Sequence, residues 1–373
     1  MADGESALEG MVLNDLFGGT YANRRVLVTG HTGFKGSWLC LWLSAMGARV
    51  TGLALPPNTD PSHWTLLGLD VAEDLRVDLR DAIAVRLALT HAQPEIVFHL
   101  AAQPLVRRSY REPETTFATN VLGLVHLLEA VRDCRSVRAV VNATTDKVYL
   151  EQIAETGYRE DHPLGGHDPY STSKACAELV SACYRKSYFA NQDGACTRLA
   201  TARAGNVIGG GDWSEDRLVP DLIRAASSGG VLKIRNPDAI RPWQHVLDPL
   251  SGYLRLGQGL LAGDPVEGAW NFGPAADATL SVRALVALMH ADWPELRSEF
   301  EKGSHPHEAE VLRLDCSKAE RELGWRPVWS ADTTLQRTSR WYRDFYGDGR
   351  LRSTDDLHAF ILAARVAGLG WAT

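Results

Sequence analysis

A tyrosine and a lysine stand four residues apart near the middle of the chain, as Tyr170 and Lys174. On a helix, residues at i and i+4 lie on the same face, so these two side chains are expected to be neighbours. An ammonium beside a phenol favours the phenolate, which predicts a lowered pKa for the tyrosine. Such a tyrosine can take the proton of a hydroxyl group while a hydride leaves the same carbon. The spacing is common by chance, so it predicts this chemistry only in a suitable fold.

A second group of reactive side chains, Thr144-Thr145-Asp146-Lys147, follows the apolar run Ala139–Ala143. Thr145 can hydrogen-bond a reacting hydroxyl, and Asp146 and Lys147 add two titratable groups beside it. Oxidising or inverting an alcohol needs no such pair. Eliminating water does, because one proton must be removed and another delivered. The alternative for Asp146 and Lys147 is a surface ion pair at the end of a strand.

Three glycines, Gly30, Gly33 and Gly36, form a G-x-x-G-x-x-G array between a predicted strand and a predicted helix. Glycines at this point permit a tight turn and let the backbone approach a pyrophosphate, which the helix N-terminus then stabilises. The position of the array favours dinucleotide binding over a purely structural turn. His99-Leu-Ala-Ala-Gln103 ends a later strand, at the sheet edge where ligands of open α/β folds lie.

The second predicted strand, Ala48–Leu53, lacks the acidic residue that anchors the adenosine ribose of NAD at its end. Arg49 begins that strand and is poorly placed to hold a 2′-phosphate. The strand alone therefore does not decide between NAD and NADP. Asp78 and Leu79 follow a third predicted strand and could reach the adenine ring, although Asp78 as a simple loop cap is the alternative.

Short β-branched runs alternate with longer helical segments from residue 24, which predicts an α/β fold with a doubly wound parallel sheet of the Rossmann type. The predicted strands are Arg25–Thr29, Ala48–Leu53, Ile96–Leu100, Ala139–Ala143 and Ala195–Arg203, and the predicted helices are Gly36–Met46, Ala82–His91, Glu114–Asp133 and Ser171–Phe189. Gly/Pro-rich loops follow at Asn206–Trp213, Asn236–Trp243 and Asn271–Ala276. We predict a dinucleotide-binding domain at 22–203, to which the chain returns near 241–255, and a smaller, interleaved, discontinuous substrate-binding lobe at 204–373.

The predicted helix Glu114–Asp133 is apolar nearly all round, which indicates burial on two sides. One side would lie on the sheet. The other would meet either a partner subunit, which predicts a homodimer or a higher homo-oligomer, or the second lobe of the same chain.

The bulk composition excludes some classes of protein. A net charge of −7 argues against nucleic-acid binding, which would need a basic surplus. The six cysteines have no metal-binding spacing, so we expect free thiols, no metal and a cytoplasmic location. The first 20 residues lack a basic n-region, and charged or glycine residues interrupt the apolar stretch Trp38–Leu55. Neither a signal peptide nor a membrane span is therefore expected.

The chain resembles the CDP-glucose 4,6-dehydratases, a family of extended short-chain dehydrogenases/reductases. The resemblance is carried, in collinear order over about 300 residues, by GHTGFKGSWL (30–39), FHLAAQPLVRRSY (98–110), TTDKVY (144–149), DPYSTSKACAEL (168–179), RAGNVIGGGDW (203–213), RLVPDLI (217–223), RPWQHV (241–246), NFGP (271–274) and LDCSKAERELGW (314–325). Sister dehydratases that act on dTDP-glucose or GDP-mannose carry Asp-Glu or Glu where this chain has Asp146-Lys147. The stretch Leu150–Thr156 departs from the asparagine- and tryptophan-containing pattern of the family.

The resemblance implies a redox-neutral lyase reaction on CDP-glucose that gives CDP-4-keto-6-deoxyglucose. Tyr170, held by Lys174 and Thr145, would deprotonate the C4 hydroxyl while NAD accepts the C4 hydride and later returns it to C6. Lys147, acting in its neutral form, would remove the C5 hydrogen, and Asp146 would protonate the departing C6 hydroxyl. The expected NAD-binding residues are Gly30, Thr32, Gly33, Phe34, Lys35, Gly36, Asp78, Leu79, Leu100, Ala101, Ala102, Asn120, Tyr170 and Lys174.

The expected substrate-binding residues are Gln103, Asn206, Arg217, Leu218, Val219, Arg241, Asn271 and His307. Arg241, in a proline-flanked turn, would meet the diphosphate with support from Asn206, and the segment 217–220 would line the base. Two rivals stay open: a nucleotide-sugar 4-epimerase or reductase, and a cofactor-sensing binding protein without catalysis. Residues alone do not identify the base, so a dTDP-, UDP- or GDP-hexose is an alternative substrate.

Overall fold

A seven-stranded parallel sheet forms the centre of the structure, a computed structural model that describes residues 13–151, 157–189, 197–234, 236–275, 279–300 and 313–373. Its strands are β1 (Arg25–Thr29), β2 (Arg49–Ala54), β3 (Glu73–Arg76), β4 (Ile96–His99), β5 (Ala139–Ala143), β6 (Arg198–Arg203) and β11 (Gly268–Asn271). They lie in the order β11-β6-β5-β4-β1-β2-β3, and each neighbouring pair runs parallel. The predicted doubly wound sheet is confirmed, and β11, which was not predicted, extends it beyond β6.

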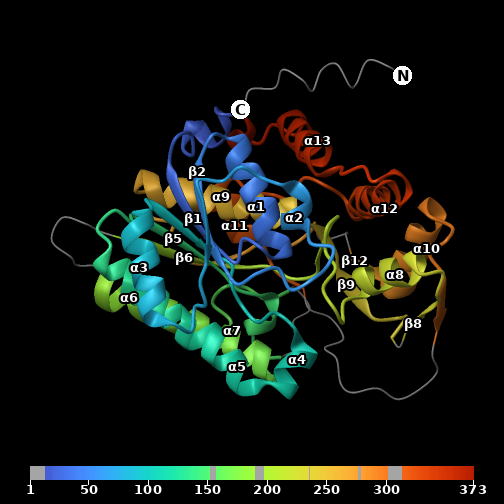
Figure 1. Cartoon of the computed structure of the whole chain (residues 1–373), viewed down its shortest axis with the longest axis horizontal. Coiled ribbons are helices and arrows are strands. Elements are labelled where there is room, and N and C mark those ends of the chain that lie inside the picture. Colours follow the sequence, from blue (N-terminus) through green and yellow to red (C-terminus); the bar gives the residue numbers. More distant parts are fainter. Residues whose placement is uncertain (1–12, 152–156, 190–196, 235, 276–278, 301–312) are drawn as a thin grey trace.

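Alternate residues of the strands serve the two faces of the sheet, as the strand period of two requires. Val26 and Val28 of β1 belong to one core, and Leu27 between them belongs to another. The first core contains helices α1 (Phe34–Ala45) and α9 (Leu247–Ala262), and the second contains α3 (Ala82–Ala92), α6 (Gly123–Asp133) and α7 (Pro169–Tyr184). Figure 1 shows these two helix layers on opposite sides of the sheet.

Two predicted long helices are each divided in the structure. The segment predicted as one helix over Glu114–Asp133 consists of α5 (Pro113–Phe117), a π-helical turn η2 (Ala118–Leu122) and α6. The segment predicted over Ser171–Phe189 is α7 followed by a π-helical turn η4 (Arg185–Phe189). Single π-helical turns inside helices occur often at functional sites, and η2 carries the buried Asn120 discussed below.

A separate hydrophobic core lies to one side of the sheet. It includes Trp213, Trp341 and residues of α8 (Leu218–Ser227), α10 (Val282–Asp292) and α12 (Ala331–Asp348). Two small sheets flank it, β8 (Leu232–Ile234) with β13 (Ser298–Phe300) and β9 (Ile240–Pro242) with β12 (Thr279–Ser281). Figure 1 shows this smaller lobe beside the carboxyl ends of the strands.

The chain after Arg203 contributes to both parts. Helix α9 and strand β11 lie with the sheet, and α13 (Ser353–Val366) and Trp325, after α11 (Ser317–Leu323), pack into the core that contains α1. The return near residues 241–255 falls at the start of α9, and the domain boundaries themselves stay a prediction.

The remaining short elements are η1 (Leu16–Gly19), α2 (His63–Leu67), α4 (Val106–Arg111), η3 (Asp146–Val148), β7 (Val207–Ile208), β10 (Gln244–His245) and η5 (Gly370–Ala372). None of the helices within the described ranges combines the length and apolarity needed to span a membrane.

Candidate active site

The glycine turn after β1 is built for close backbone approach. Gly30 has φ +75°, and a Cβ there would lie 2.7 Å from the backbone nitrogen of Ala101. A Cβ on Gly36 would lie 2.1 Å from the Gly30 carbonyl oxygen. Both positions therefore require glycine, the first for its conformation and both for packing.

Gly33 is different, because it is exposed and caps the N-terminus of α1 without any side-chain acceptor. The first backbone N–H groups of α1 thus face outward with the positive end of the helix dipole behind them. This is the arrangement that holds a pyrophosphate in dinucleotide-binding folds, so the residues present fit such a group.

The strand beside the glycine turn is held by a buried hydroxyl. Thr29 Oγ1 lies 2.7 Å from His99 Nδ1 and accepts hydrogen bonds from the backbone nitrogens of Leu100 and Ala101. These contacts fix the loop Leu100–Gln103 against Gly30, at the carboxyl edge where the sequence predicts it. Burial and the nearby Lys174 lower the pKa of His99 to about 3, so this histidine is neutral.

Three other predicted cofactor residues, Asp78, Leu79 and Asn120, make contacts within the protein. Asp78 pairs with the Arg80 guanidinium, which lowers its pKa, and it also accepts from the Arg80 backbone nitrogen, as a loop cap does. Leu79 is buried in the second core. The amide of Asn120 bonds the backbone of Gln103 and the Ser173 hydroxyl. Asn120 therefore fastens the loop after β4 to α7.

The loop after β5 brings Thr145 and Asp146 into the interior. Thr145 Oγ1 donates to Asp146 Oδ1 at 2.9 Å, and Asn206 Nδ2 lies 3.4 Å from Asp146 Oδ2. Asp146 is only 2% exposed, which excludes the alternative of a surface ion pair. Lys147 is half-buried, and its ammonium has no polar partner within the described part of the chain.

Helix α7 carries Tyr170 and Lys174 on its inner face. Asp168 caps the helix by accepting from the Ser171 backbone nitrogen, and Pro169 occupies its first turn. Ser109 Oγ in α4 accepts a hydrogen bond from the Tyr170 backbone nitrogen. The Thr145 hydroxyl lies close enough to Tyr170 to lower the pKa of that phenol, so the two predicted groups meet.

The predicted lowering of the tyrosine pKa is wrong. Burial raises the pKa of Tyr170 to about 12, and this outweighs the hydrogen bond with Thr145 and the charge of Arg217, which both lower it. Burial also lowers the pKa of Lys174 to about 8, against the opposing charge of Glu178. Lys174 Nζ donates to the Ala143 carbonyl at 3.0 Å.

A second lysine lies close to this group. Lys35, in the first turn of α1, places its Nζ 3.5 Å from the Tyr253 hydroxyl on α9. Burial lowers the pKa of Lys35 to about 7, and the charge of Arg217 adds to the effect. Burial raises the pKa of Tyr253, and the nearby Tyr170 would raise it further when charged. The glycine turn, α9 and α7 therefore converge on one site.

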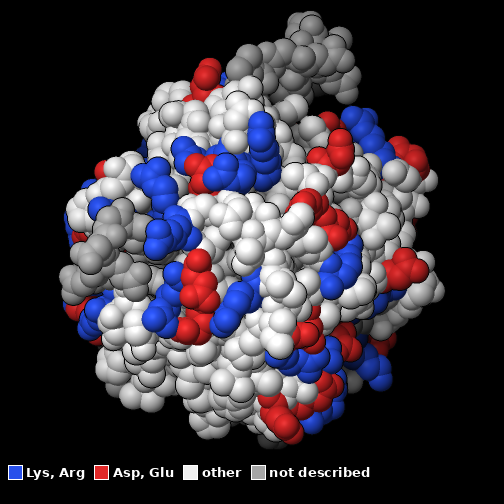
Figure 2. Space-filling view, turned by 60° about the vertical axis from the view of Figure 1, so that its left-hand side comes forward, with Lys and Arg blue, Asp and Glu red and all other residues white. Residues whose placement is uncertain are grey.

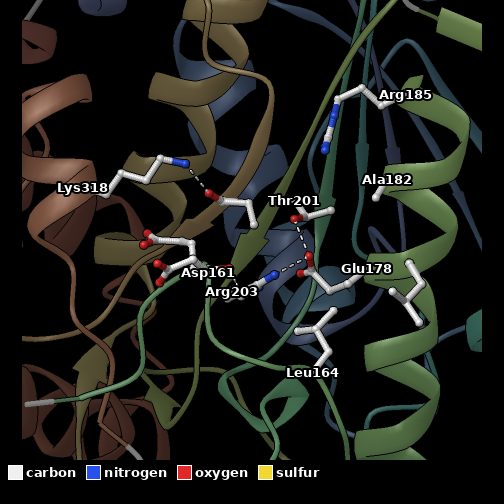
Figure 3. A pocket seen from close by; sticks show the side chains of 11 residues that line it. Asp161, Leu164, Glu178, Ala182, Arg185, Thr201, Arg203 and Lys318 are labelled. Atoms are coloured by element: carbon white, nitrogen blue, oxygen red, sulfur yellow. Dashed lines mark hydrogen bonds and ion pairs between the residues drawn. The ribbon is translucent and has the colours of Figure 1, made fainter. Parts of the chain in front are cut away.

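A buried ion pair between Arg203 and Glu178 lies beside the loop after β5. Glu178, one turn after Lys174, accepts from the Thr144 and Thr201 hydroxyls and pairs with Arg203 at 2.9 Å. Arg203 in turn donates to the Tyr149 hydroxyl. Figure 3 shows Glu178, Thr201 and Arg203 of this network at the wall of a charged pocket. The pocket has a volume of about 350 Å³ and is lined also by Glu160, Asp161, Leu164, Leu179, Ala182, Arg185, Ala269 and Lys318.

Several residues expected to bind substrate have their polar groups engaged within the protein. Gln103 bonds the Thr116 hydroxyl and the backbone of Leu105. Asn271 is fully buried in β11 and bonds the Tyr149 hydroxyl and two backbone carbonyls. Val219 lies in the core of the smaller lobe, against which Leu218 packs. This arrangement supports structural roles for Gln103, Asn271 and Val219.

Of the other expected substrate residues, Asn206 and Arg217 lie near Asp146 and Tyr170. Arg217 caps α8, pairs with Asp212 at 3.1 Å and lies close enough to Tyr170 and Lys35 to shift their pKa values. Arg241 is in strand β9 rather than in the predicted turn, because Leu280 of β12 pairs with it. His307 lies outside the described residues. The roles of Asn206, Arg217 and Arg241 as substrate ligands stay predictions.

Sequence reasoning missed three residues that shape the site. Glu178 could have been found, since it continues the face of Tyr170 and Lys174 at the next i+4 step. Tyr253 and Gly205 gave no local signal. A Cβ on Gly205 would lie 2.0 Å from the Asp146 carboxyl, so glycine is needed to leave room for it.

The surface and the side-chain clusters add two observations. Basic and acidic side chains are interspersed over the face drawn in Figure 2. Across the described ranges, no cluster of three or more histidine, cysteine or carboxylate side chains is arranged to hold a metal ion.

Comparison with known proteins places this site in a family. A family model described as GDP-mannose 4,6 dehydratase matches residues 27–338. The chain is 50% identical over 328 residues to CDP-glucose 4,6-dehydratase of Salmonella typhimurium (strain LT2), which covers 87% of this chain and 91% of that protein. It is 30% identical to UDP-glucose 4-epimerase of Mycolicibacterium smegmatis, over 86% of this chain and 99% of the epimerase.

A solved structure agrees with the sequence relatives. The dTDP-glucose 4,6-dehydratase of Streptomyces venezuelae, a double mutant with NAD bound, superposes with a TM-score of 0.71 and 28% identity, over 87% of this chain and 98% of that one. The family match spans the sheet, the helix that bears Tyr170 and most of the smaller lobe. On that basis the chain belongs to the GDP-mannose 4,6 dehydratase family.

Proposed function

We propose that this chain is an NAD-dependent lyase that converts CDP-glucose to CDP-4-keto-6-deoxyglucose and water. The observation that supports it best is the buried Asp146, bonded to Thr145 within the group that also contains Tyr170 and Lys174. The 50% identity to a CDP-glucose 4,6-dehydratase supports the choice of sugar nucleotide.

Tyr170, Lys147 and Asp146 each transfer a proton in the proposed reaction. Tyr170 accepts the proton of the C4 hydroxyl. Thr145 lies next to Tyr170, and Lys174 follows one turn later on α7. Lys147 removes the C5 proton from the 4-ketone, and Asp146 acts as the acid that delivers a proton to the C6 hydroxyl, which leaves as water. Lys147 then returns a proton to C5. When bound, NAD supplies a positive charge beside the phenol, the acceptor for the C4 hydride and the donor that returns it to C6.

The raised pKa of Tyr170 fits this sequence of steps. A phenol with a pKa of about 12 stays protonated at neutral pH, so it becomes a base only when positive charge lies next to it. The charge of Arg217 already lowers this pKa without offsetting burial, so NAD, when bound, would have to supply the further positive charge. We propose that the outward N–H groups at Gly33 hold the pyrophosphate and that Arg217 and Arg241 meet the substrate diphosphate.

The test separates oxidation from elimination. Lys147→Ala should bind NAD and oxidise C4, seen as reduced nicotinamide, yet should not release water from the sugar by mass spectrometry. The wild-type enzyme in deuterated water should place deuterium at C5. Retention of the C5 hydrogen, with inversion at C4, would instead favour the 4-epimerase suggested by the second relative.

The nucleotide base of the substrate is tested by comparing four sugar nucleotides. The wild-type enzyme is incubated separately with CDP-, dTDP-, UDP- and GDP-glucose, and the loss of water is followed by mass. We expect the fastest turnover with CDP-glucose. Faster turnover of another nucleotide sugar would keep the dehydratase and change its substrate.

We also propose a homodimer and a cytoplasmic location. Large apolar side chains are exposed where α5 and η2 pack on α7: Leu179 at 60%, Leu122 at 55% and Phe117 at 36%. A helix face of this kind suits a second copy of the chain. The cysteines in the described ranges, Cys40, Cys134, Cys176, Cys183 and Cys316, are free, as thiols are in a reducing compartment.

A further inference from the structure

The end of strand β2 is where a dinucleotide-binding fold reads the adenosine ribose. In NAD-binding proteins a carboxylate at this point accepts from the ribose 2′-hydroxyl. Here β2 ends at Ala54 and continues with Leu55, so it provides no carboxylate. The neighbouring strand β3 pairs its last residue, Arg76, with Ala54. A cation therefore occupies the neighbourhood of the missing acid.

The Arg76 guanidinium reaches across to the end of β2. Its Nη1 lies 3.4 Å from the Leu55 carbonyl oxygen, and its side chain is 36% exposed. Thr32, from the glycine turn, donates its hydroxyl to the same carbonyl oxygen at 3.0 Å. Two hydrogen-bond donors from separate segments thus gather at one carbonyl, next to the turn that approaches the pyrophosphate.

A carboxylate, Asp74, pairs with Arg76. Asp74 accepts from Arg76 Nη2 at 2.5 Å through one oxygen, and its other oxygen lies 2.9 Å from His31 Nε2. Asp74 pairs with Gly52, two residues before Ala54, so it lies further from the carboxyl edge than Arg76 does. Both of its oxygens are engaged by positively charged or ring N–H groups, whereas the Nη1 of Arg76 is engaged only by the neutral Leu55 carbonyl, at 3.4 Å.

The balance of donors and acceptors points to an anion. A free 2′-hydroxyl at this edge would meet the Leu55 carbonyl as an acceptor, which two donors already occupy. A 2′-phosphate would draw the Thr32 hydroxyl and the Arg76 guanidinium from that neutral carbonyl, because hydrogen bonds to a charged acceptor are stronger and a guanidinium suits phosphate oxygens best. We propose that the cofactor site of this chain accepts a 2′-phosphorylated dinucleotide, NADP, as well as NAD, with Arg76 and Thr32 as the phosphate-binding residues. This inference rests on the proposed placement of the dinucleotide over the glycine turn.

The experiment measures binding by titration calorimetry on the full-length protein, without turnover. The ligands are NAD⁺ and NADP⁺, together with 5′-AMP and 2′,5′-ADP, which isolate the adenosine end. We expect NADP⁺ to bind within about tenfold of NAD⁺, and 2′,5′-ADP to bind more tightly than 5′-AMP. Loss of one charge-assisted hydrogen bond should weaken binding by about 10- to 100-fold.

Three variants test whether Arg76 is the residue that strengthens the binding of the 2′-phosphorylated ligands. Arg76→Gln should weaken NADP⁺ and 2′,5′-ADP by that factor and change NAD⁺ by less than about threefold, whereas Arg76→Lys should restore part of the loss. The control is Arg25→Gln, an arginine 48% exposed at the amino end of β1, which should change neither.

The outcomes separate this inference from the proposed function. If NAD⁺ bound and NADP⁺ bound more weakly by more than about a thousandfold, the inference would be wrong. An equal loss of both cofactors in Arg76→Gln would show that Arg76 does not read the 2′-phosphate. Either result would leave the proposed NAD site standing. Failure of the wild-type protein to bind either dinucleotide would overturn the proposed cofactor site and this inference with it.

Discussion

Replacing Gly205 with alanine should disable the elimination of water while leaving the fold intact. The added Cβ would lie 2.0 Å from both Cγ and Oδ2 of Asp146 and 2.2 Å from Oδ1. Ordinary contacts between such atoms are about 3.5 Å, so the carboxyl group must retreat by more than about 1 Å. Gly205 does not have a positive φ, so its backbone accepts alanine without strain.

The retreat removes the contacts that hold the acid in place. Asp146 would lose the Thr145 hydroxyl at 2.9 Å and the Asn206 amide at 3.4 Å. Each buried hydrogen bond contributes about 1 kcal/mol to stability, so the two together amount to about 2 kcal/mol, a loss that a folded enzyme tolerates. A misplacement of about 1 Å at a reacting group costs about 100-fold in rate. We therefore expect dehydration to fall by about 100-fold with only a small change in melting temperature.

The assay follows both steps with CDP-glucose in a single turnover. Reduced nicotinamide, read by absorbance, reports C4 oxidation, which depends on Tyr170 and Lys174. Loss of water, read by mass spectrometry, reports elimination. The Gly205→Ala enzyme should accumulate the reduced cofactor, because oxidation continues while the following step is slow.

The control is Gly210→Ala, five residues further along the chain. Its Cβ would lie 2.1 Å from the ring of Trp341 in the smaller lobe, so it should lower stability without moving Asp146. If Gly205→Ala released water within threefold of the wild-type rate, or lost oxidation and elimination equally, Asp146 would not be the acid that this reasoning requires.

Three further predictions concern charge and assembly. Burial lowers the pKa of Lys174 from 10.5 to about 8, so its ammonium is lost as the pH rises through 8; C4 oxidation should decline above that pH, and Lys174→Arg should move the decline upward. A decline at the same pH in the arginine variant would assign it to another group. Burial raises the pKa of Asp248 from 3.8 to about 7, so the folded protein keeps a proton that the unfolded chain releases, and stability should fall as the pH rises from about 4 to 7. Denaturant unfolding of Asp248→Asn should show a flatter dependence, and an unchanged slope would contradict the assignment. Leu179→Glu should turn a dimer into a monomer in sedimentation experiments, whereas Leu362→Glu, at a side chain 52% exposed on α13, should not; a dimer that survives Leu179→Glu would place the interface elsewhere.

The sequence by itself determined the features that depend on neighbours in the chain. The bounds of β1 and β5 agree with the predicted strands, because apolar β-branched runs between turn signals define a strand locally. The glycine turn was equally readable, since conformation and close packing require those residues at that spacing. Tyr170 and Lys174 are both buried in α7, as an i, i+4 pair on one helix face, and Asp168 and Pro169 lie at the start of that helix.

Only the tertiary structure decided how distant segments share the site. Asn206 reaches Asp146 from 60 residues away, and Tyr149 bonds Asn271 across 122 residues. No local pattern encodes such pairs, because they arise when strands far apart in the chain become neighbours in the sheet. The same holds for the pKa of Tyr170: the spacing predicts the nearby lysine, but burial by the surrounding helices and strands sets the direction of the shift.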